Sequence, residues 1–192
     1  VLNDKFYVGR ALDNRIGGFI IAEVARLLKE NNIKLPFGLY VTNSVQEEVG
    51  LRGAQMIVDT IKPDVAIVTD VCHDTRTPMI DKIQQGDSQC GDGPVLFYGP
   101  AVQNNLLDLI ISTSKNNKIP FQRGAASRST GTDTDAFAYA NGGVASCLIS
   151  LPLKYMHTTV EMAHKDDVNN VILLIYYALQ RINDNHDFRY LK

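Results

Sequence analysis

Apolar residues along the chain recur at helical spacing in some segments and run together in others. In residues 15–30 they recur from Ile16 to Leu28 on one face, which predicts an amphipathic helix whose first turn Asp13 or Asn14 can cap. The same criterion predicts three further helices, at residues 51–62, 102–117 and 166–184.

Four short segments rich in β-forming residues predict strands, at residues 37–43, 64–70, 94–98 and 145–151. The second of these is a continuous apolar run that ends in an acid, which is typical of a buried parallel strand. Residues 123–135 are polar and small, so they predict a surface loop that leads into a helix at 135–140. Helices and strands alternate without an intervening linker, which predicts one α/β domain over residues 1–192.

The composition argues against several classes of protein. The 192 residues carry 19 Lys and Arg against 21 Asp and Glu, so there is no basic excess to bind nucleic acid. No apolar run is long enough to span a membrane. The three cysteines are odd in number and have no zinc-finger or CxxC spacing, which favours reduced thiols and a cytoplasmic protein.

Acidic and imidazole side chains follow the predicted strands. Glu47 and Glu48 come after the strand at 37–43, Asp70 ends the next strand, and His157 follows the strand at 145–151. Asp13 lies just before the first helix. Because the carboxyl ends of parallel strands meet at one edge of a sheet, we expect all five side chains to gather there.

Clustered carboxylates repel one another, and burial makes their charge more costly. A divalent cation offsets both costs, and oxygen ligands with an imidazole suit zinc, cobalt or manganese. Two such ions could polarise a carbonyl and activate a water. One glutamate of the EE pair could then bind metal while its neighbour serves as general base.

Each residue also has an ordinary structural explanation. Asp13 could be a helix cap, and the glutamate pair could be solvated surface charge. Asp70 could accept loop amides, and His157 could be a hydrogen-bonded structural histidine. The metal hypothesis therefore rests on the set, because all five residues map to one end of one sheet.

Five blocks of the sequence resemble, in order, the M42 family of metallo-aminopeptidases: ALDNRIGG, NSVQEEVGLRGA, VTDVCHDT, GTDTDAF and SLPLKYMHTTVEMAHKDDV. The resemblance extends through essentially the whole chain. It implies a three-layer α/β/α peptidase core with a mostly parallel central sheet. The family includes glutamyl, leucyl and lysyl aminopeptidases, which act on peptides with a free N-terminus.

The resemblance implies a site for two divalent metal ions. By motif, Asp13 is similar to the carboxylate that bridges the ions, and Glu48 and His157 to further ligands of one ion. Asp70 is similar to a ligand of the second ion. Glu47 is similar to the general base, which takes a proton from water and returns it to the leaving amine.

The sequence also departs from the family pattern. The family has a histidine in an HxD motif upstream of the bridging aspartate, and a small dimerisation domain between the two. No histidine precedes Asp13 here, so we expect residues 1–192 to be the C-terminal portion of a longer catalytic domain. Family members form homo-oligomers and act on short peptides. By this resemblance, we expect the same of the intact protein.

Smaller departures concern the substrate pocket. Lys154 stands where the family often has arginine, and Thr134 and Asp135 stand where it has small residues. In the family, Thr132 and Asp133 would lie near the substrate. Two loop arginines, Arg123 and Arg128, could pair with an acidic substrate or be solvated.

Two other functions stay open at this point. A glycoside hydrolase would use paired carboxylates across a sugar site without a metal, so a chelator would leave it active. An inactive fragment with an incomplete metal site would hold at most one ion tightly. Measuring metal content and its effect on cleavage separates these hypotheses from the aminopeptidase.

Overall fold

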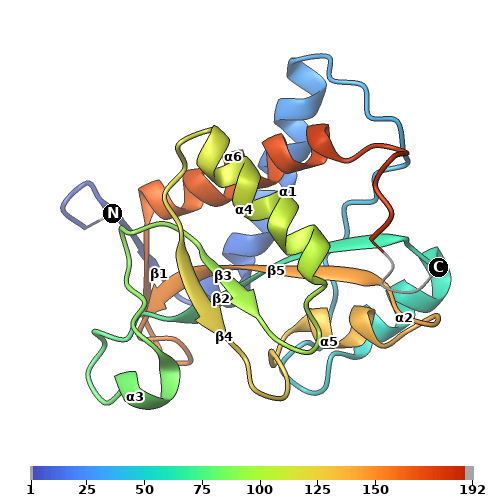
Figure 1. Ribbon diagram of the computed structural model, residues 1–192. Helices are drawn as coiled ribbons and strands as arrows, with labels where there is room; N and C mark the ends of the chain where they lie inside the picture. Colours follow the sequence, from blue (N-terminus) through green and yellow to red (C-terminus); the bar gives the residue numbers. More distant parts are fainter. Residues whose placement is uncertain (1, 189–192) are drawn as a thin grey trace.

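The computed structural model describes residues 2–188 (Figure 1). The predicted α/β class is confirmed, and the four long helices predicted from apolar spacing form within three residues of their predicted bounds. The helices are α1 (Leu12–Glu30), α2 (Arg52–Ile61), α3 (Lys82–Gln85), α4 (Asn104–Asn116), α5 (Asp133–Ala138) and α6 (Lys165–Arg181). The strands are β1 (Phe6–Gly9), β2 (Val65–His73), β3 (Val95–Tyr98), β4 (Gln122–Ala125), β5 (Ala145–Lys154) and β6 (Glu161–His164).

All the strands belong to one sheet, in the order β1-β6-β5-β3-β4, with β2 also paired to β5. Strand β5 is the centre of this sheet and is buried over nearly its whole length. Strand β2 lies parallel to β5 from Val65, which pairs with Ala145, to His73, which pairs with Leu153. The C-terminal ends of β2 and β5 therefore lie at the same edge of the sheet.

The prediction of a mostly parallel sheet is wrong, because the sheet is mixed. Among the strand pairs of residues 2–188, β2–β5 and β3–β4 are parallel, whereas β1–β6, β3–β5 and β5–β6 are antiparallel. Residues 155–160 are all that joins β5 to β6. A parallel crossover needs a dozen residues or more, so this short connection requires an antiparallel pair.

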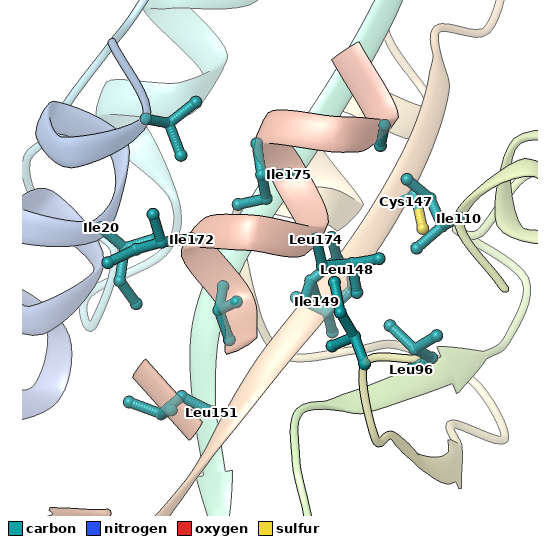
Figure 2. Packing of buried hydrophobic residues seen from close by; sticks show 14 of the residues in the cluster. Ile20, Leu96, Ile110, Cys147, Leu148, Ile149, Leu151, Ile172, Leu174 and Ile175 are labelled. Carbon is teal, nitrogen blue, oxygen red and sulfur yellow. The ribbon is translucent and has the colours of Figure 1, made fainter. Parts of the chain in front are cut away.

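Helices cover both faces of the sheet (Figure 1). On one face, α1, α4 and α6 form the main hydrophobic cluster with β3 and β5. Figure 2 shows Leu174 of α6 beside Leu148 and Ile149 of β5, and Ile172 of α6 beside Ile20 of α1. On the other face, α2 and α5 form a smaller cluster with β2. Among residues 2–188, no helix is both long and apolar enough to cross a membrane.

The strand predicted at residues 37–43 does not form. The segment has β-forming side chains, but Leu39, Tyr40 and Val41 are exposed and no described strand pairs with it. Strand propensity reflects packing against neighbouring strands, so without a partner this composition leaves an irregular extended segment. The loop predicted at 123–135 is also partly wrong, because its first three residues belong to β4, which pairs with β3.

Candidate metal centre

The first turn of α1 positions Asp13. The backbone at Asp13 and Asn14 departs from helical dihedral angles, so the regular helix begins only after them. Asn14 Oδ1 accepts the N–H of Gly17 at 2.9 Å, and Asn14 Nδ2 donates to the carbonyl of Thr69 in β2 at 3.0 Å. Of the two predicted caps, Asn14 therefore provides the cap, and the Asp13 carboxylate is left for another role.

A tight turn, rather than the end of a strand, presents Glu47 and Glu48. The N–H groups of Gly50 and Leu51 both donate to the Glu47 carbonyl, at 3.1 and 3.0 Å. The turn closes where Gly53 N–H donates to the Val45 carbonyl at 2.9 Å. A Cβ on Gly53 would lie 2.4 Å from that oxygen, so this close approach requires glycine.

His157, in the loop after β5, lies close to the side chains of Asp13 and Glu48. Its Nε2 lies 3.1 Å from Asp13 Oδ2 and 3.5 Å from Glu48 Oε2. One possible ligand atom from each of Asp13, Glu48 and His157 lies within 4.8 Å of the others. We call these three residues the ligand cluster.

The ligand cluster fits a divalent metal ion. Two carboxylates and an imidazole are the donor set of many zinc sites, and cobalt or manganese accept the same donors. The cluster lines a pocket of ≈ 590 Å³, with Arg10 and Thr158 also on its wall. Burial and then the charge of Glu48 raise the pKa of Asp13 to about 6. A bound cation would relieve this electrostatic cost.

Asp70 lies near the ligand cluster at the C-terminal part of β2. Its side chain is buried, with only 7% of the residue exposed, and Oδ1 accepts the N–H of Val71 at 2.8 Å. Burial raises the pKa of Asp70 to about 8 despite that hydrogen bond, and the charges of Glu47, Asp13 and Asp133 add to the rise. Asp70 therefore lies within electrostatic reach of the ligand cluster.

The charge of Glu47 interacts both with the ligand cluster and with Asp70. Burial, followed by the charges of Glu48 and Asp133, raises its pKa to about 7. A carboxyl group with this pKa exchanges protons readily near neutral pH, which is the property of a general base.

The structure adds Asp133 to the acidic side chains of the site. Burial raises the pKa of Asp133, and the hydroxyl of Ser44 hydrogen-bonds to its Oδ2. Its other oxygen is buried and has no hydrogen-bond partner among the described residues. The sequence placed Asp133 only near the substrate, in GTDTD, and the structure also brings its charge close to Glu47 and Asp70.

Glu161 is a further residue of the site, and the sequence motifs did not point to it. This residue begins β6 and is only 2% exposed, and its carboxylate accepts the backbone N–H groups of Asp13 and His157. The one sequence signal for it is an acid among apolar residues in TTVEMAH. That signal is weak, because an acid at the start of a strand is usually solvated.

The structure brings three of the five predicted site residues to metal-ligand spacing and leaves the other two outside that group. Within the part of the chain that the structure describes, the group at metal-ligand spacing contains Asp13, Glu48 and His157 but neither Glu47 nor Asp70. The latter two are linked to it by electrostatic interactions. One ion therefore has three candidate ligands in place, whereas a second ion would have Asp70 and a shared Asp13.

Comparison with known proteins identifies the family. Residues 1–174 match the family of M42 glutamyl aminopeptidases. The chain belongs to the M42 family. Among M42 relatives, a lysyl aminopeptidase of Pyrococcus furiosus is 36% identical over 181 residues, which cover 94% of this chain and 50% of the relative.

Solved M42 structures share the fold. A TET aminopeptidase from the marine sediment archaeon Thaumarchaeota archaeon SCGC AB-539-E09 superposes with a TM-score of 0.88 at 32% identity, over 95% of this chain and 51% of that one. PhTET1, solved as a dodecamer, superposes with a TM-score of 0.70 at 28% identity, over 92% of this chain and 51% of that one. This chain therefore spans about half the length of the M42 proteins that it matches.

Proposed function

We propose that this M42 protein is a metal-dependent aminopeptidase that releases the N-terminal residue of short peptides. The observation that carries the proposal is the ligand cluster, in which three segments far apart in the sequence bring two carboxylates and an imidazole within 4.8 Å. A glycoside hydrolase would need a pair of carboxyl groups but no imidazole between them. The position of His157 Nε2, between Asp13 and Glu48, therefore favours the peptidase.

Asp13, Glu48 and His157 would hold one divalent ion, which could be zinc, cobalt or manganese. Asp70 would contribute to a second ion, with Asp13 shared between the two. When bound, the ions would polarise the scissile carbonyl and make a water molecule more acidic.

Glu47 would move the proton. It would accept a proton from the attacking water and then pass that proton to the nitrogen of the leaving amine, and burial of its carboxyl group raises its pKa above that of a free glutamate. The neighbouring glutamate, Glu48, is itself part of the ligand cluster. One residue of the adjacent pair would therefore bind metal while the other transfers the proton.

The M42 relatives are about twice as long as the matched region. In the family pattern that this sequence resembles, a further histidine ligand lies upstream of the bridging aspartate. We propose a cytoplasmic homo-oligomer, since PhTET1 is a dodecamer and the three cysteines here are free.

The proposed base is tested by Glu47→Gln in the full native protein. We expect the turnover of aminoacyl amides to fall by at least about 100-fold, which is the usual contribution of a general base. Metal content, measured by plasma mass spectrometry, should stay unchanged because Glu47 is not in the ligand cluster. The matched control is Glu30→Gln on the exposed end of α1, which should keep full activity.

Two results would contradict the proposal. Full activity of the Glu47→Gln protein would show that the base is misassigned. Cleavage of a glycan that survives removal of metal by a chelator would instead support a glycoside hydrolase.

A further inference from the structure

Glu161 connects the two segments that carry most of the ligand cluster. Its Oε2 accepts the backbone N–H of Asp13 at 3.1 Å, and its Oε1 accepts the backbone N–H of His157 at 3.1 Å. Asp13 and Glu161 are separated by 148 positions in the sequence. Both oxygens of one carboxylate are therefore used to hold the main chain of two candidate metal ligands.

Within residues 2–188 the Glu161 carboxylate is buried without a cationic partner, and its two hydrogen bonds to main-chain N–H groups compensate for that burial. Glu161 is 2% exposed, and an isolated buried carboxylate is strongly disfavoured. The two N–H groups offset that cost, because hydrogen bonds to an ionised acceptor are stronger than neutral ones. No Lys or Arg forms an ion pair with Glu161 among the residues that the structure describes.

The loop that carries His157 needs such a tether. His157 has a φ of 62°, in the left-handed region that residues other than glycine seldom adopt. The imidazole itself is 62% exposed, so side-chain packing does little to hold it. A hydrogen bond to the His157 N–H is therefore a direct means of fixing the loop that presents the imidazole.

The geometry points to Glu161 as a positioning residue that assembles the metal site before a metal binds. It holds the Asp13 and His157 backbones at the separation at which His157 Nε2 lies 3.1 Å from Asp13 Oδ2. This role rests on the proposed metal binding by the ligand cluster. It adds that the affinity for metal depends on a side chain whose two oxygens both hold main-chain N–H groups.

The test compares metal binding by two variants of the full native protein, prepared free of metal. In Glu161→Gln the side chain keeps its shape, but its NH₂ group can no longer accept one of the two N–H groups. The matched control is Asp167→Asn. Asp167 is also fully buried and accepts two backbone N–H groups, from Gly91 at 2.6 Å and Gly93 at 2.8 Å, but it is outside the ligand cluster.

Titration calorimetry with Co²⁺ gives the first readout. We expect Glu161→Gln to weaken Co²⁺ binding by about 10- to 100-fold, as loss of a residue behind the ligands typically does. Asp167→Asn should bind Co²⁺ within about twofold of the wild type, even if both variants lose similar thermal stability. Binding by Glu161→Gln within twofold of the wild type, or equal weakening by both variants, would overturn the role.

The absorption spectrum of bound Co²⁺ gives the second readout. A positioning residue leaves the set of ligands intact, so the saturated Glu161→Gln protein should have the wild-type spectrum. A change in intensity that indicates a lost ligand would mean that Glu161 determines which ligands bind the metal and not only their position, which contradicts the role. Wild-type protein that does not bind Co²⁺ would instead overturn the proposed metal-dependent function.

If Glu161→Gln fails to fold, hydrogen exchange in the metal-free wild type decides the matter. The amides of Asp13 and His157 should exchange slowly, because a buried acceptor holds them. The amide of Thr159, in the same loop and on the exposed surface, is the reference for fast exchange. Equally fast exchange of Asp13 and His157 would overturn the role.

Discussion

The three side chains of the ligand cluster are held to different degrees. The Asp13 side chain is only 10% exposed, whereas those of Glu48 and His157 are 58% and 62% exposed. Exposed side chains keep more rotamer freedom and lose it when they bind a ligand. The buried carboxylate of Asp13 is thus the fixed point of the site, and a metal would order the other two around it.

The charge of Asp133 affects the proposed base. Asp133 is one of the charges that raise the pKa of Glu47 to about 7, although burial is the larger cause. In Asp133→Asn we therefore expect the pKa of Glu47 to fall but to stay above that of a free glutamate, because burial still raises it. Carbon NMR titration of the Glu47 carboxyl group in metal-free protein measures this shift.

The control for that titration is Asp135→Asn, in the same helix. The Asp135 carboxylate accepts the N–H groups of Thr130 and Gly131 and is not among the charges that raise the pKa of Glu47. The pKa of Glu47 should be unchanged in this variant. An equal shift in both variants would mean that a change in the loop, not the charge of Asp133, acts on Glu47.

At the scale of single elements, the start of α1 determines where Asp13 lies. Two adjacent glycines follow it, and they differ in their surroundings. A Cβ on Gly17 would lie 2.4 Å from the Asn14 side chain, which is fixed by hydrogen bonds to Gly17 and Thr69. A Cβ on Gly18 would meet no atom closer than 3.7 Å.

We therefore expect opposite effects from two alanine substitutions. Gly17→Ala should destabilise the protein by about 1–3 kcal/mol, because it displaces the Asn14 cap and leaves the Thr69 carbonyl without its donor. Gly18→Ala should be neutral or stabilise the helix by up to about 1 kcal/mol. Urea unfolding measures both values, and equal effects of the two substitutions would show that the Asn14 contact is not limiting.

The elements also show what the sequence can predict. Apolar spacing predicted α1, α4 and α6 well, because each buries one face and local residues determine that face. The β-forming composition of residues 37–43 predicted a strand that does not form, because strand formation depends on a pairing partner and not on composition alone. The sequence patterns also could not give the direction of β5 relative to β3 and β6, because strand pairing involves residues far apart in the chain.

The site shows the same limit. Asp70 and His157 could be predicted because each follows or ends a strand that forms, whereas the strand expected before Glu47 and Glu48 does not form and a turn presents that pair. Three of the five predicted residues, Asp13, Glu48 and His157, meet at ligand spacing. Glu161 was missed because its importance lies in two backbone N–H groups, which no side-chain pattern records. The charge interactions of Asp133 with Glu47 and Asp70 likewise follow from folding, since the three residues come from separate segments.

For the whole molecule, the acidic side chains of the site make the free energy of unfolding depend on pH. The pKa values of Asp13, Glu47 and Asp70 are raised from 3.8, 4.5 and 3.8 to about 6, 7 and 8. Between about pH 4 and pH 8, the folded chain therefore binds more protons at these groups than the unfolded chain does. By linkage, their contribution to stability is present at low pH and is lost as the pH rises through the folded pKa values.

Metal-free protein should accordingly melt at a lower temperature at pH 8 than at pH 5, by on the order of 5 °C. Saturating Mn²⁺ should raise the melting temperature more at pH 8, because it binds the ionised carboxylates. Asp70→Asn removes the most strongly raised of the three groups, so it should flatten the pH dependence of the metal-free protein. Scanning calorimetry of the wild type and of Asp70→Asn measures the melting temperature at each pH. An unchanged dependence of melting temperature on pH in Asp70→Asn would show that the burial of Asp70 is not what destabilises the metal-free protein at high pH.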